Sequence, residues 1–500
     1  MSLLLRPVPS TRSSAGRPLF GVAGVVAGVV MGVLVVTPLV AIVPYLAILS
    51  LLVVLTVVDH RITIPTIVAL QLVLGTVRRW SEYTWGEIAF IDPLLVAPPL
   101  LTAVLFLIAV RNGALARRGP LTGAVLLIFV IGLVGAFNPL QGSPIVGLLG
   151  ASITLTPVAW FWVGRALLDD ALLKRTLVVV GATNLVAAVY GIYQSGGFFF
   201  AFDQAWIDAL GETYNSIFVG GGIARPIGLA SSAAEFGKNL GIAVCVFGAI
   251  ALTHHGRARW LAVAGALVVG TALTLSALRT TTVLTVAALG LMYGVRLRIS
   301  LTRLVVFATL AVGLMLVGLQ FAPTSFGSSS AGVLLGRQVG GISDPLNPEA
   351  STVGEHVGAV RNALTYTVTN PVGLGTAATT QAGKQLGTSA SADQDIGDVA
   401  LSWGVMGVVV YLLFGARLVA RAVEVARHRR DWLGVAAIGI IAVSALQWFN
   451  GGLYSAAVIA WAVFGWLDRP DQLPGPSPGP GLVHGDAQSL GAPAPVLTPR

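Results

Sequence analysis

Two arginines in this sequence are well placed to bind a phosphate group. Arg279 lies in the segment TLSALRTT (274–281), at a short turn between two apolar runs. Arg225 lies in GGIARPIGLASSAAEFGKN (221–239), where the glycines allow the backbone to fold over a ligand. A guanidinium held at a turn on the membrane surface can bind lipid phosphate through paired hydrogen bonds. The alternative is that both arginines merely extend to the membrane interface with their alkyl stems buried.

Other ionisable residues gather in two long polar segments, 194–236 and 322–400, and loops of that length are usually functional or disordered. The first segment contains Asp203, Asp208, Glu212, Arg225 and Glu235, with Lys238 just beyond it, and the second contains Arg337, Asp344, Glu349, Glu355, His356, Arg361, Lys384, Asp393, Asp395 and Asp398. His356 is the only histidine in these segments, and the single cysteine, Cys245, lies in an apolar run. We therefore predict no metal site and no cofactor.

The elements that must position these residues are apolar helices. The chain has 500 residues, of which 55% are hydrophobic and 10% charged, and its mean hydropathy is +0.84. A membrane span needs about 20 apolar helical residues, and runs of that kind predict fourteen spans. They lie near 19–37, 39–58, 62–77, 92–110, 121–137, 144–164, 176–193, 237–253, 260–277, 280–295, 303–321, 401–416, 432–449 and 452–466. We predict an all-α, polytopic integral membrane protein of about 12–14 helices, with 194–236 and 322–400 as its long external loops.

The distribution of basic residues predicts the orientation of these spans. Short cytoplasmic loops are enriched in Lys and Arg, and an N-terminus placed inside puts most of the 30 basic residues, including the cluster at 417–430, on the cytoplasmic side. The prediction is a cytoplasmic N-terminus (1–18), one membrane domain (19–469) and a disordered, Pro/Gly-rich cytoplasmic tail (470–500). Because loop topology explains the basic excess, we expect no binding to nucleic acid.

Three segments between about 180 and 420 resemble motifs of a known family. RPIGLASSAAEFGKNLGIAV is similar to an Arg-x-x-Gly stretch leading into a helix, and TLSALRTTTVLTVAALGL is similar to a Thr-x-Ser-Arg helix entry in which Ala277 and Leu278 are extra. RNALTYTVTNPVGLGTA and DQDIGDVALSWGVMGVVVYLL resemble a Pro-x-Gly-x-Gly loop followed by a helix with Gly-x-x-Gly. In this order and spacing the segments resemble the O-antigen ligase and polymerase family of bacterial envelope enzymes.

The resemblance implies a metal-independent glycosyltransferase of the bacterial inner (plasma) membrane. Such enzymes move an oligosaccharide from undecaprenyl pyrophosphate to an acceptor hydroxyl on the external face. The implied partners are a lipid-linked oligosaccharide donor, a glycan, lipid or protein acceptor, and membrane lipids. The family's arginines map to Arg225 and Arg279 as pyrophosphate ligands, and we keep Lys238 and Arg361 as further candidates.

The resemblance also bears on the general base that glycosyl transfer requires. Where ligases of the family have a His-Asn pair, this chain has Asp393 followed by glutamine, which favours a polymerase or an atypical ligase. Asp393, Asp395 and His356 are therefore alternative bases, with Asp393 preferred for its motif position. His356 stands where many members have an arginine, so either it takes over a polar role or Arg361, one turn on, supplies the charge.

Two rival functions remain open. A flippase or permease for a lipid-linked glycan would use the same outward arginines, but ionisable groups within the membrane would favour it, and the predicted spans show few. Another polytopic lipid-sugar glycosyltransferase would commonly have an acidic pair in its first external loop, where this chain has only a short turn near residue 38.

Overall fold

The computed structural model describes residues 43–85, 93–116, 118–211, 218–219, 222–321, 327–345, 347, 352–386, 390, 394–429, 431–449 and 454–472. Its principal apolar helices are α2 (Val43–Val58), α3 (His60–Trp85), α4 (Pro93–Arg111), α5 (Thr122–Gly135), α6 (Pro144–Leu167), α7 (Asp170–Ser195), α9 (Ala233–Thr253), α10 (Gly256–Leu275), α11 (Arg279–Arg296), α12 (Leu301–Gln320), α16 (Asp395–His428), α17 (Trp432–Ser444) and α18 (Tyr454–Leu467). The remaining elements are α8 (Ala201–Gly211), α13 (Ser330–Ser343), α14 (Val353–Thr369), α15 (Gln381–Leu386), the 3-10 turns η2 (Pro139–Gln141) and η5 (Pro470–Gln472), and an antiparallel pair of two-residue strands, β1 (Phe218–Val219) and β2 (Ile223–Ala224).

The all-α prediction is confirmed, because every predicted span after the first coincides with a helix. The first span, 19–37, lies outside the described residues. Seven of the described helices, α3, α6, α7, α9, α10, α12 and α16, are at least 18 residues long and apolar enough to cross a membrane. Shorter apolar helical stretches of 10–17 residues are Ile48–Val58 in α2, Ala97–Arg111 in α4, and the helices α5, α17 and α18. The chain is thus a polytopic helical membrane protein.

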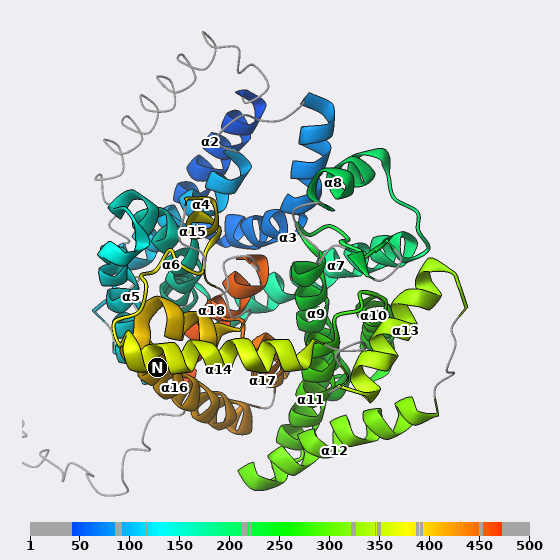
Figure 1. Cartoon of the computed structure of the whole chain (residues 1–500). Coiled ribbons are helices and arrows are strands. Elements are labelled where there is room, and N and C mark those ends of the chain that lie inside the picture. The colour runs from blue at the N-terminus through cyan, green and yellow to red at the C-terminus, as the bar shows by residue number, and fades with distance from the viewer. Residues whose placement is uncertain are drawn as a thin grey trace, which may run out of the picture.

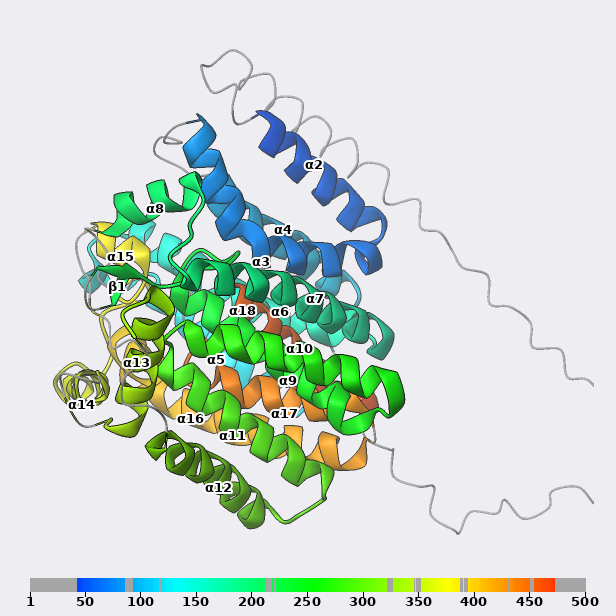
Figure 2. The same cartoon turned by 90° about the vertical axis from the view of Figure 1, so that its right-hand side faces the viewer.

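The two long polar segments come together at one end of the bundle. In Figure 2 the long helices run in roughly one direction, and α8, β1, α13, α14 and α15 gather at their left-hand end. We call this end the loop face. The helices α9, α11, α16 and α18 begin at this end, and α3, α7 and α17 end there. Residues near these helix termini can therefore meet although they are far apart in the sequence.

The opposite end of the bundle, which we call the basic face, is held by ion pairs between helix connections. Arg429 contacts Asp170 at 2.5 Å, and Lys174 contacts Asp431 at 3.5 Å, so the α16–α17 connection is joined to the start of α7. In the first pair an arginine of the connection meets the carboxylate at the start of α7, and in the second a lysine of α7 meets the carboxylate of the connection.

Small residues let the central helices pack closely. Between α6 and α18, a Cβ added at Gly164 would lie 2.8 Å from the carbonyl carbon of Ala462, and one added at Gly465 would lie 2.7 Å from that of Phe161. Close approach of this kind drives helix association in lipid, where the hydrophobic effect between helices is absent. Figure 1 shows α18 surrounded by its neighbours, and Trp461 and Trp466 on it are fully buried.

The loop after α14 packs into a break in α16. Gly404 interrupts α16 with φ 62° and ψ −151°, a conformation that residues other than glycine rarely adopt. The backbone of the Pro-x-Gly-x-Gly loop fills the gap: Val405 N donates to Pro371 O at 3.0 Å, and Gly375 N donates to Ser402 O at 3.0 Å. The two glycine motifs of the third matched segment therefore contact each other and determine the path of α16.

Candidate functional site

Three arginines from separate elements form a cationic cluster at the loop face. Arg225 follows β2, Arg279 is the first residue of α11, and Arg337 lies in α13. All three are half-buried. Burial and the positive charges of Arg279 and Arg337 lower the pKa of Arg225 to about 10, and the charge of Arg337 also acts on Arg279. Among the residues that the structure describes, no ion pair joins Arg225 to a carboxylate, and its Nε is buried without a hydrogen-bond partner.

The scaffold of this cluster consists of the strand pair, the turn before α11 and α13. Val219, Ala277 and Leu334 form one small apolar core, which packs the strand pair against both other elements. Ala277 has φ 55°, so the turn before Arg279 adopts a left-handed conformation that is unusual for alanine. Gln338 Nε2 donates to Thr282 Oγ1 at 2.8 Å and so joins α13 to the first turn of α11.

A buried polar network supports the backbone that follows Arg225. Arg79, near the end of α3, forms an ion pair with Asp203 of α8 at 2.6 Å, and both side chains are completely buried. Arg79 also donates to the carbonyl oxygens of Gly228, at 2.6 Å, and Ala230. On the other side, Gln194 Oε1 accepts from Gly228 N at 2.8 Å. These contacts fix the segment between β2 and α9 against α3 and α7.

Lys238 and Asp395, both predicted site residues, are buried inside the bundle. Lys238 is 1% exposed and donates from Nζ to Val443 O at 2.9 Å. Asp395 is also 1% exposed, and its carboxylate accepts the backbone N–H groups of Trp448 and, at 3.1 Å, Phe449. The two side chains interact electrostatically. The hydrogen bond of Lys238 joins α9 to the last turn of α17, and those of Asp395 join the start of α16 to the chain between α17 and α18.

A second carboxylate at the start of α9 belongs to the same region. Glu235 accepts from Ser455 Oγ at 2.6 Å and from Ser231 N at 3.1 Å, and its side chain is buried. The loop-face ends of the helices therefore contain more buried charge than the predicted spans suggested.

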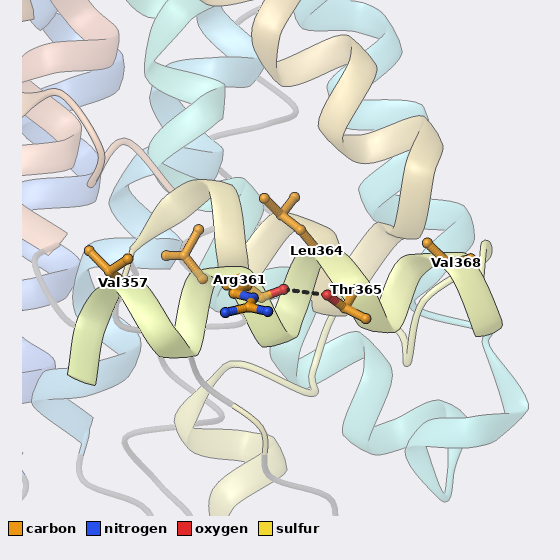
Figure 3. A pocket seen from close by; sticks show the side chains of 6 residues that line it. Val357, Arg361, Leu364, Thr365 and Val368 are labelled. Carbon is orange, nitrogen blue, oxygen red and sulfur yellow. Dashed lines mark hydrogen bonds between the residues drawn. The ribbon is translucent and has the colours of Figure 1, made fainter. Parts of the chain in front are cut away.

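Arg361 and His356 lie on α14, apart from the arginine cluster. Figure 3 shows Arg361 between Val357 and Thr365 along one side of this helix, where these residues, with Val360, Leu364 and Val368, line an open depression of about 490 Å³. Arg361 is exposed, and His356 is half-buried. Arg361 is not among the described charges that act on Arg225. Asp393, the preferred base, lies outside the described residues.

Sequence reasoning singled out two of the three clustered arginines and missed Arg337 and Arg79. Arg337 stood among the loop charges without any motif, and Arg79 stood just beyond a predicted span. The distribution of basic residues could have identified them, because both are among the few basic residues predicted to lie on the external side, where Lys and Arg are usually depleted. Comparison of the chain with protein-family models and with curated proteins gives no match. Chemically, the cluster of Arg225, Arg279 and Arg337 is suited to bind a polyanion at the loop face.

Proposed function

We propose that this protein is a membrane glycosyltransferase that moves an oligosaccharide from undecaprenyl pyrophosphate to an acceptor hydroxyl at the loop face. The observation that carries the proposal is the cluster of Arg225, Arg279 and Arg337, which presents three cations where a lipid pyrophosphate would lie. The resemblance of the surrounding segments to the O-antigen ligase and polymerase family supports it. We further propose that the loop face is the external side of a bacterial inner membrane.

The chemistry requires stabilisation of the pyrophosphate leaving group and removal of the acceptor proton. An arginine and a phosphate about 4 Å apart attract by about 4 kcal/mol at an effective dielectric near 20, so the cluster supplies the first requirement without a metal. The acceptor oxygen attacks the anomeric carbon as the bond to the pyrophosphate oxygen breaks, which inverts the configuration. Asp393 and His356 are the proposed alternative bases. We assign Asp395 a supporting role, because two backbone amides occupy its carboxylate.

A flippase for a lipid-linked glycan is the second candidate, and one observation favours it. The buried charges of Lys238, Asp395, Arg79 and Asp203 lie on or beside apolar helices, and ionisable groups within the membrane often mark transport pathways. The two functions differ in their products. A transferase forms a new glycosidic bond, whereas a flippase moves an unchanged lipid across the bilayer.

The test is to incubate the purified protein in lipid nanodiscs with a pool of lipid-linked oligosaccharides and to analyse the products. A ladder of glycans would identify a polymerase, and a single conjugate would identify a ligase. Arg279→Ala should lower the transfer rate by about a hundredfold to a thousandfold, as with other donors that serve a developing negative charge. Arg279→Lys should recover only part of the rate, because lysine keeps the charge but loses the planar fork.

The matched control is Arg257→Ala, which removes an exposed arginine at the basic face and should leave transfer unchanged. Near-normal turnover by Arg279→Ala would contradict the proposal. Movement of the donor lipid across a vesicle bilayer without any new glycosidic bond would favour the flippase.

A further inference from the structure

We propose that α13 forms one wall of the pyrophosphate site, with Arg337 as a third phosphate ligand and Gly341 as the residue that positions Arg279. This inference rests on the proposed function and extends it by assigning roles to two residues of a helix for which no motif was recognised. In this proposal two arginines balance the charge of the bound donor, and Arg337 stabilises the additional negative charge that develops during transfer.

The geometry at Gly341 is specific to that residue. A Cβ added at Gly341 would lie 2.7 Å from Cζ of Arg279 and closer still to its Nη1 and Cδ. The guanidinium of Arg279 therefore lies directly against the backbone of α13. By contrast, a Cβ added at Gly336 or Gly340 of the same helix would meet no atom within 4 Å. Only Gly341 among these three glycines makes room for the arginine.

The register of α11 and α13 places Arg337 beside this contact. Arg279 meets Gly341, and three residues further along α11, Thr282 accepts the hydrogen bond of Gln338. Residues four apart lie on the same face of a helix, so Arg337 is one turn from Gly341 on the face that Arg279 contacts. The charge of Arg337 acts on both Arg279 and Arg225.

The charge of the reacting group explains why three cations are present. A glycan-linked polyprenyl pyrophosphate has two ionised oxygens. When the bond from the anomeric carbon to the pyrophosphate breaks, the electron pair remains on the departing oxygen and adds a third negative charge. The new bond to the acceptor oxygen releases a proton to the general base. Interactions that strengthen only as this charge develops raise kcat rather than tighten substrate binding.

The experiment compares Gly341→Ala with Gly340→Ala, a matched control on the same helix. We expect Gly341→Ala to lower glycan transfer by about tenfold or more, because misplacing a charged donor by about 1 Å has large effects on rate, and to weaken the binding of inorganic pyrophosphate several-fold. Gly340→Ala should leave both within about twofold, since a methyl group there meets no neighbour. Thermal melting of both variants checks folding, and neither should melt earlier than the parent protein.

Arg337→Ala provides the second test, through the separation of kcat from KM. We expect kcat to fall by about a hundredfold, as for other donors to a developing charge, with KM changed by less than about threefold. Arg337→Lys should restore part of kcat.

Equal behaviour of Gly341→Ala and Gly340→Ala would overturn the positioning role, and a raised KM with unchanged kcat in Arg337→Ala would overturn the role of the third arginine. If Arg279→Ala abolishes transfer while the α13 variants are normal, only this inference fails. If Arg279→Ala itself is normal, the proposed function fails.

Discussion

Replacing Arg79 by methionine should destabilise the protein strongly, although the residue lies in no recognised motif. Methionine fills similar space but leaves the carboxylate of Asp203 buried without its cation. The carbonyl oxygens of Gly228 and Ala230 also lose their donor. Breaking a fully buried ion pair costs about 3–5 kcal/mol, and each unsatisfied buried acceptor adds about 1–3 kcal/mol. Because these terms overlap, we expect a loss of about 5 kcal/mol.

The assay is reversible unfolding in mixed micelles followed by tryptophan fluorescence, combined in a double-mutant cycle with Asp203→Asn. The double variant should be less destabilised than the sum of the single variants by about 2 kcal/mol or more. In Arg79→Met alone, Asp203 is a buried charge without its partner, and Asp203→Asn removes that charge. Arg78→Met is the matched control. Its ion pair with Glu82, at 3.9 Å, and its contact with the ring of Trp206, at 5.2 Å, are both partly exposed, so it should cost only about 1 kcal/mol.

The reasoning is refuted if Arg79→Met and Arg78→Met prove equally mild, or if the cycle shows no coupling. Either result would mean that the segment between β2 and α9 is held by other contacts. If the stability loss is confirmed, the same variant should also bind inorganic pyrophosphate more weakly, since that segment begins at Arg225.

Two further predictions concern the break in α16 and the orientation of the chain. Gly404→Ala should destabilise the protein by more than the about 1–3 kcal/mol that a strained backbone usually costs, because the added methyl would also lie 2.8 Å from the carbonyl carbon of Val372. Gly415→Ala, whose added methyl would make ordinary contact with Trp448, should be tolerated. Equal melting temperatures of the two variants would contradict this. A cysteine at exposed Thr365 of α14 should react with an impermeant thiol reagent in intact cells, while cysteines at Ser10 and Ser477 should not, because the charge alternation places both termini inside. Labelling of either terminus would reverse that assignment.

Much of the fold could be predicted from the sequence because the bilayer imposes a local rule. Backbone groups in lipid must be satisfied within their own segment, so each helix is encoded by a continuous apolar run and can be recognised without its neighbours. That is why the spans from 39–58 onward coincide with helices. The same local reasoning singled out Arg225 and Arg279, because an arginine on the external side runs against the usual distribution of charge.

Contacts between segments distant in the sequence were decided only by tertiary structure. Lys238, at the start of a predicted span, and Asp395, in a predicted loop, were candidate site residues, yet packing of α9 and α16 against the end of α17 and the chain after it buries both. Arg337 joins the arginine cluster because α13 packs against the strand pair and the start of α11. Such contacts depend on which helix faces meet and in what register. A run of apolar residues encodes the existence of a helix but not its neighbour. The sequence alone therefore determined the helices, and only their packing decided which polar side chains meet at the loop face.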